Sequence, residues 1–184
     1  FGANDGLDWS TYYGGTDIEI GNCIAVDGFG NCYIAGRTQS TSTSLPLVNP
    51  GGGSTYFQGT YSGGTLGDGF VSCFSNSGTL IWATYYGGSD NDEILGIAVD
   101  ANSNVYACGK TTSANFPIPS PNLTNAFSQT TLQSGSGDED AFLLGFTSNR
   151  ELIWGTYFGG SHSGFPIVTG QDFGNSVATF QNSK

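Results

Sequence analysis

The chain has 184 residues and a formal net charge of −11, with only four lysine and arginine residues. This acidic balance excludes a nucleic-acid partner, which requires a basic face, and does not suit an anionic membrane surface. Aromatic residues make up 14% of the chain and glycine occurs 30 times, so short strands joined by turn-rich loops are expected rather than disorder. No apolar run is long enough to span a membrane.

Methionine is absent, and the chain begins at Phe1 without a charged and apolar signal segment. We therefore expect a processed product or a fragment that begins downstream of the translation start. Four cysteines without C-x-x-C spacing, in a lysine-poor chain, fit an exported protein better than a zinc-binding or thioredoxin-like one.

A nine-residue phrase occurs three times and organises the whole sequence. It spans residues 7–15, 80–88 and 152–160, and each copy contains one of the three tryptophans and ends in Gly-Gly. The copies begin 73 and 72 residues apart. Self-similarity at a fixed period is the signature of repeat architectures.

Each repeat unit is expected to contain four strands, because its apolar residues follow no helical period. In chain order, the strands of two complete units are predicted at residues 22–27, 31–38, 69–74, 79–86, 95–100, 104–111, 141–146 and 151–158. A lone strand at about 7–14 precedes them, and another at about 174–180 follows them. The chain then divides into a strand from a preceding blade (1–15), repeat 1 (16–88), repeat 2 (89–160) and a partial repeat 3 (161–184).

Both faces of the predicted strands are apolar. Within residues 79–86, for example, Trp82 and Tyr86 point one way and Tyr85 points the other. An antiparallel sheet of this kind must be covered on both sides. We therefore expect an all-β segment over residues 1–184, with about two complete four-stranded antiparallel blades of a β-propeller plus partial flanking strands. A β-sandwich is the alternative fold.

Two long loops, at about 38–67 and 111–139, separate the second and third strands of the units. Loops of this length are usually functional or disordered. Both loops carry apolar residues in register, so we expect ordered flaps held at the outer edge of each blade. These residues are Leu45, Phe57, Phe116 and Phe127.

The motifs S/T-T-Y-aromatic-G-G, I-A-V-D, N-x-Y-x-x-G-K/R-T, F-P and D-x-F together resemble the SBBP repeat. They stand, for example, at residues 10–15, 24–27, 31–38, 116–117 and 68–70. SBBP repeats are β-propeller repeats of large secreted and cell-surface bacterial proteins. The resemblance covers nearly the whole chain and implies a propeller outside the cytoplasm, in a protein with more repeats than this chain has. It brings no catalytic residues, and the truncated third unit departs from its pattern.

Acidic residues cluster after Gly-Gly and before the third strand of a unit. Clustered carboxylates can bind calcium, so calcium is the one cofactor that the sequence suggests. The candidate ligands are Asp90, Asp92, Glu93, Asp138 and Asp140. Their spacing is not that of an EF-hand loop, and the third unit carries no acid at the corresponding place. Solvated loop charge is therefore the preferred interpretation, and no cofactor is expected.

We expect no enzymatic activity and no catalytic residues. Paired carboxylates alone do not indicate a glycosidase, and no Gly-x-Ser-x-Gly motif accompanies His162, the only histidine. The tryptophans recur at an internal strand position, which indicates core packing rather than sugar stacking. Asp27 and Asp100 precede turns and are expected to form Asx turns.

A hairpin centred on Phe29 places Cys32 opposite Val26, and Cys32 corresponds to Val105 of the next unit. Cys108 lies three residues further on and therefore projects from the opposite face. Because stacked blades bring opposite faces together, the favoured disulfide is Cys32–Cys108.

The sequence thus predicts a structural or adhesive segment of an extracellular bacterial β-propeller surface protein, secreted or held at the cell surface. Its expected partners are other blades of the same parent protein or neighbouring subunits in an assembly or filament. The alternative is a carbohydrate-binding module or a polysaccharide-active enzyme, with a glycan ligand held by loop acids and aromatic residues.

Overall fold

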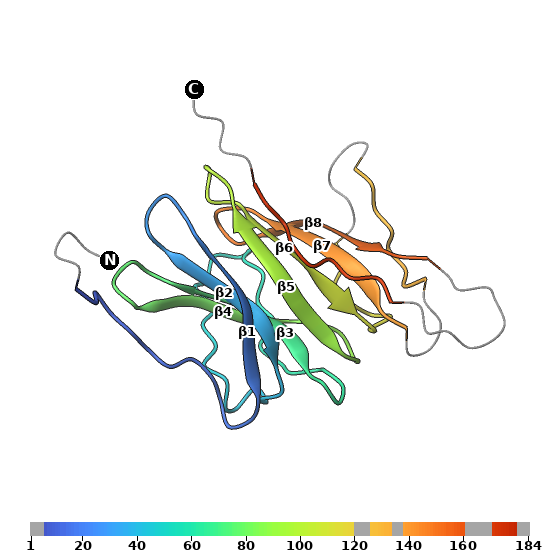
Figure 1. Cartoon of the computed structure of the whole chain (residues 1–184), viewed down its shortest axis with the longest axis horizontal. Coiled ribbons are helices and arrows are strands. Elements are labelled where there is room, and N and C mark those ends of the chain that lie inside the picture. The colour runs from blue at the N-terminus through green and yellow to red at the C-terminus, as the bar shows by residue number, and fades with distance from the viewer. Residues whose placement is uncertain (1–5, 120–125, 134–137, 161–170, 180–184) are drawn as a thin grey trace.

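The computed structural model describes residues 6–119, 126–133, 138–160 and 171–179, and these residues form two four-stranded antiparallel sheets without a helix (Figure 1). Blade 1 consists of β1 (Glu19–Val26), β2 (Cys32–Thr38), β3 (Asp68–Phe74) and β4 (Leu80–Tyr86), paired in that order. Blade 2 consists of β5 (Asp92–Val99), β6 (Val105–Thr111), β7 (Asp140–Phe146) and β8 (Leu152–Phe158), in the same order. The two predicted four-stranded blades are confirmed.

An aspartate shapes the turn between the first two strands of each blade. Asp27 Oδ1 accepts hydrogen bonds from the backbone N–H groups of Phe29 and Asn31, both at 2.9 Å. Asp100 repeats the arrangement with Asn102 and Asn104. Both aspartates form the predicted Asx turns, which satisfy backbone donors where the chain reverses.

A bulge next to the second strand explains the glycine that the G-K/R-T motif carries in both repeats. The register of β1 against β2 shifts between Gly21 and Cys23. A side chain at Gly36 would collide there with the carbonyl oxygen of Ile20, and one at Gly109 would collide with that of Glu93. Only glycine permits this approach of two backbones.

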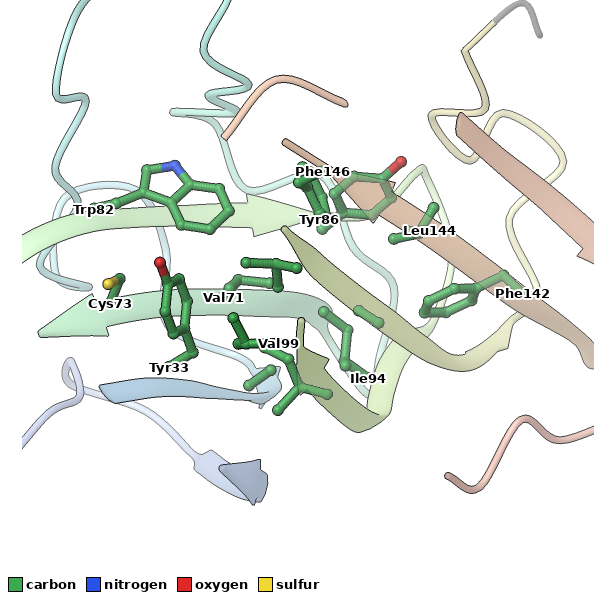
Figure 2. Packing of buried hydrophobic residues seen from close by; sticks show 14 of the residues in the cluster. Tyr33, Val71, Cys73, Trp82, Tyr86, Ile94, Val99, Phe142, Leu144 and Phe146 are labelled. Carbon is green, nitrogen blue, oxygen red and sulfur yellow. The ribbon is translucent and has the colours of Figure 1, made fainter. Parts of the chain in front are cut away.

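The two blades stack face to face, with β5 lying against β1, β2 and β3 (Figures 1 and 2). We call the side of blade 1 that faces blade 2 its front face, and the side of blade 2 that meets it the back face of blade 2. The front face of blade 1 comprises Tyr33, Ala35, Val71, Cys73, Trp82 and Tyr86. The back face of blade 2 comprises Ile97, Val99, Val105, Ala107, Phe142, Leu144 and Phe146. Repeat-equivalent residues therefore face in the same direction around the stack, as in a propeller.

The segments beyond the two blades are not strands. Residues 7–14 carry no strand assignment, although Trp9 and Tyr13 pack against Phe74 on the back face of blade 1. Residues 174–179 lie beside blade 2, where Thr179 Oγ1 donates to the Val99 carbonyl at 2.8 Å. The predicted strands at 7–14 and 174–180 are therefore wrong over their described residues, because neither segment has the neighbouring strands that would complete a sheet.

The first long loop is ordered along the outer edge of blade 1, as predicted. Val48 and Gln58 form isolated β-bridges with β4, and Leu45 is buried. In the second loop Phe116 is buried against the core, whereas Phe127 is 60% exposed and is not the anchor predicted for it.

The predicted Cys32–Cys108 disulfide is wrong: all four cysteines are free. The predicted register is correct, since Val26 pairs with Cys32. However, Cys32 lies on the back face of blade 1 and Cys108 on the front face of blade 2. These are the two outer faces of the stack, so the two thiols point away from each other.

Candidate functional site

A carboxylate follows each Gly-Gly turn and accepts a hydrogen bond from the second glycine. Gly15 N–H donates to Glu19 Oε2 at 2.8 Å, and Gly88 N–H donates to Asp92 Oδ2 at 2.7 Å. Gly160 N–H donates to Asp172 Oδ2 at 3.3 Å. The expectation that the third unit lacks an acid here is therefore wrong; an insertion in the sequence separates Asp172 from its Gly-Gly.

Hydroxyl groups from the end of the second strand complete the environment of this carboxylate. In blade 2, Thr111 Oγ1 donates to Asp92 Oδ1, and Ser113 Oγ donates to Asp92 Oδ2 at 2.9 Å. In blade 1, Thr38 Oγ1 donates to Glu19 Oε1 at 2.7 Å. The threonine of the G-K/R-T motif thus holds the carboxylate of its own blade.

A second carboxylate begins the third strand of each blade, within the D-x-F motif. Asp68 and Asp140 are both fully buried. Oδ2 of Asp68 accepts the backbone N–H of Ser62 at 2.8 Å, and Oδ2 of Asp140 accepts that of Gln133 at 2.8 Å. None of the described residues donates a hydrogen bond to Oδ1 of either aspartate. Each blade therefore contains a buried aspartate oxygen that receives no hydrogen bond from the part of the chain that the structure describes.

The two kinds of carboxylate meet at the junctions between units. Asp92 Oδ2 and Asp68 Oδ1 lie 2.6 and 2.7 Å from the point that a Cβ at Gly87 would occupy. At Gly159 the corresponding point lies against Asp140 Oδ1 and 3.0 Å from Asp172 Oδ2. The first glycine of each Gly-Gly pair thus leaves the room in which two carboxylates approach each other.

Burial controls the acidity of the Asp68–Asp92 pair. Loss of solvent raises the pKa of Asp68 to about 6, although the Ser62 and Gly63 backbone groups counteract part of the rise. Burial likewise raises the pKa of Asp92 to about 7, and the charge of Asp68 adds to this rise. Two carboxylates confined in one dry space do not both ionise readily.

A chain of ion pairs runs beside this pair. Arg37 lies 3.6 Å from Glu93, and Lys110 lies 3.7 Å from Glu93 and 2.9 Å from Glu139. Lys110 also lies over the ring of Phe173, 5.1 Å from its centroid. The charges of this chain balance one another across the blades.

The calcium candidates do not form one ligand set. Asp90 is exposed, Asp92 is buried among hydrogen-bond donors, and Glu93 is paired with two cations. Asp140 begins β7, and Asp138 lies two residues before it in the sequence. Within the described residues, no group of three or more acidic, cysteine or histidine side chains is placed to hold a metal ion.

Trp82 and Trp154 are each held by the long loop of their own repeat unit. Trp82 is fully buried and its indole N–H donates to the Tyr56 carbonyl at 3.1 Å, which confirms core packing for this residue. Trp154 N–H donates to the Phe127 carbonyl at 3.0 Å, although its ring is only partly buried. His162 lies outside the described residues.

Two of the residues at this site, Asp68 and Asp172, are not among the candidates predicted from the sequence. The D-x-F motif contained the signal for Asp68. In the first unit the motif runs from Asp68 to Phe70, and in the second it runs from Asp140 to Phe142. A carboxylate at the start of an otherwise apolar strand indicates a buried acid, which requires partners.

Four-stranded antiparallel sheets that stack with equivalent residues facing in one direction define a β-propeller-type repeat protein. Two segments of the chain, residues 8–42 and 81–117, match the family profile of SBBP, a β-propeller repeat. The predicted resemblance is confirmed for these segments, each of which runs from the fourth strand position of one unit through the second strand of the next. Comparison with curated proteins finds no significant match. Among the described residues, no helix is long and apolar enough to cross a membrane.

Proposed function

We propose that this chain is a structural or adhesive segment of an extracellular bacterial β-propeller surface protein, without enzymatic activity. The supporting observation is the difference in exposure between equivalent back-face residues. Ile97 and Val99 in blade 2 are 7% and 8% exposed, whereas their equivalents Ile24 and Val26 in blade 1 are 64% and 59% exposed. Apolar side chains that are buried at one junction and exposed at the next indicate a surface made to be covered.

The opposite end of the stack shows the complementary surface. Phe158, on the front face of blade 2, is 66% exposed, whereas its equivalent Tyr86 is fully buried at the junction with blade 2. A front face therefore fits a back face, and the partner is another blade. It comes from the same parent protein or from a neighbouring subunit.

The acidic, lysine-poor composition and the SBBP repeats, which are typical of secreted and surface proteins, support an extracellular location. Glycan binding has weaker support. The paired carboxylates Asp68 and Asp92 are 0% and 2% exposed, so they do not reach a polysaccharide. A glycan array with and without calcium distinguishes this alternative from the structural role, which requires no ligand.

Light scattering across a dilution series of residues 1–184 tests the open faces. Association that increases with concentration is expected, and Ile24→Glu or Phe158→Glu should each reduce it by placing a charge in an apolar contact. Phe29→Ser is the matched control, since this phenylalanine is exposed in the turn between β1 and β2. An equimolar mixture of the two glutamate variants should stop at dimers, because only one intact front face and one intact back face remain. A monomer at every concentration would contradict the proposal.

A further inference from the structure

We propose that the junction between the two blades binds one proton between two buried carboxylates, Asp68 and Asp92, and that loss of this proton weakens the junction. The two carboxylates approach each other at the first glycine of Gly-Gly, Gly87. Asp68 presents an Oδ1 that receives no hydrogen bond from the described residues. A proton on this oxygen satisfies it by making it a donor to the second carboxylate.

The distribution of donors places the proton on Asp68 rather than on Asp92. Both oxygens of Asp92 accept hydrogen bonds, from Thr111, Ser113 and Gly88, which stabilise its negative charge. Asp68 accepts only through Oδ2. Burial acts in the other direction, since the pKa of Asp92 is about 7 and that of Asp68 about 6, so the proton belongs to the pair as a whole. A proton on Asp68 is the arrangement that leaves no carboxylate oxygen of the pair without a hydrogen bond.

Among the described residues, none supplies an unpaired cation that would replace the proton. The titratable groups acting on the pair are the tyrosines Tyr56, Tyr61, Tyr85, Tyr86 and Tyr157, whose burial raises their pKa values and keeps them neutral. Arg37, Glu93 and Lys110 line the small cavity next to Asp92. Arg37 and Lys110 are, however, both paired with Glu93, and Lys110 is also paired with Glu139.

The pair joins separate units, so its charge state acts on their contact. Asp68 begins β3 of blade 1, and Asp92 begins β5 of blade 2. The backbone N–H of Asp92 donates to the Gly67 carbonyl at 3.0 Å, next to Asp68. Ionisation of both members would place two like charges across the same backbone contact.

The sign of the pH effect follows from the direction of the shift. The folded chain holds a proton that the unfolded chain releases near pH 4, so the folded state binds more protons between about pH 4 and pH 7. The stabilisation is complete below this window and is lost as the pH rises through it. The melting temperature should therefore be higher at about pH 5.5 than at about pH 8.

Asp68→Asn is the decisive variant, because its amide reproduces the protonated acid: the oxygen accepts from Ser62 and the NH₂ group donates to Asp92. We expect its melting temperature at pH 8 to exceed that of the wild type by at least about 4 °C, with much less change between pH 5.5 and pH 8. Asp100→Asn, at an exposed Asx turn, is the control and should leave the pH dependence in this window unchanged.

Infrared spectroscopy of the wild type gives a second measurement that does not depend on how the variants fold. A protonated carboxyl band should persist at pH 6 and disappear on unfolding at that pH. Absence of this band, or lower stability of Asp68→Asn at both pH values, would overturn the proposal. So would a rise in the wild-type melting temperature with millimolar calcium at pH 8 that Asp68→Asn abolishes, since a cation would then neutralise the pair.

Discussion

The indole ring of Trp82 meets the ring of Phe146 edge to face, with their centroids 5.7 Å apart, and joins β4 of blade 1 to β7 of blade 2 (Figure 2). At the preceding junction Trp9 stacks on Phe74 at 6.0 Å. One aromatic pair is thus repeated at successive back faces, but of the two tryptophans only Trp82 is fully buried.

Truncation of these two tryptophans should have unequal effects. Trp82→Ala removes a fully buried ring and should lower the free energy of unfolding by about 3–5 kcal/mol. Trp9→Ala removes a partly buried ring and should cost about 1–2 kcal/mol. Urea unfolding followed by circular dichroism measures both. If both variants lost the same free energy of unfolding, the burial of Trp82 between the blades would not contribute to their stacking.

Replacement of glycine by alanine should lower stability where two backbones approach closely and should be tolerated in an ordinary turn. Gly36→Ala places a methyl group against the Ile20 carbonyl and should lower the free energy of unfolding by about 2–3 kcal/mol. A Cβ at Gly28 would meet nothing within 4 Å, so Gly28→Ala should change stability by less than about 0.5 kcal/mol. Thermal melts of the two variants provide the comparison, and similar melting temperatures would contradict the bulge geometry.

At low pH the Asx turns should control stability with the opposite sign from the buried pair. Burial acts to raise the pKa of Asp100, but hydrogen bonds from Asn104 and Asn102 outweigh it and hold the pKa below its ordinary value. The stabilisation is present above about pH 4 and is lost as the pH falls below it. Asp100→Asn should therefore be less stable than the wild type at pH 7, with a smaller loss on acidification to about pH 2. Asp8→Asn, at an exposed position, should match the wild type throughout.

The four thiols should remain free and differ in reactivity. Cys73 and Cys108 are buried, and burial, with a smaller effect of the nearby Cys108, raises the pKa of Cys23 to about 11. Alkylation of the native protein at pH 8 should therefore modify Cys32 first. Mass spectrometry after timed quenching identifies the modified residue. A native mass lower by two hydrogens would instead reveal a disulfide.

The eight strands could be predicted from the sequence because the residue pattern of each strand occurs in both repeat units. Register followed as well: the turn residues from Asp27 to Asn31 fix Cys32 opposite Val26. Which face of blade 1 packs against blade 2 could not be predicted. An error in that one choice produced the Cys32–Cys108 pair.

The site was harder to predict than the fold because its two halves lie on different units. Asp68 and Asp92 are separated in the sequence by β3, β4 and the turns that follow them, and the missing side chain of Gly87 leaves the space in which they approach each other. Acids that are neighbours in the sequence, such as Asp90 to Glu93, indicated a single cluster instead. In the structure Asp90 is exposed to solvent, Asp92 belongs to the buried pair, and Glu93 belongs to the chain of ion pairs.

Unlike front and back faces give the stack a direction, as in a polymer with distinct plus and minus ends. A unit added at either end forms the same contacts that join the first two units. Every junction is therefore alike, however many units precede it. The number of units is then decided only by curvature, when the last front face returns to the first back face, or by a terminal unit with a polar outer side. Elongation and ring closure are thus competing outcomes of one and the same interface.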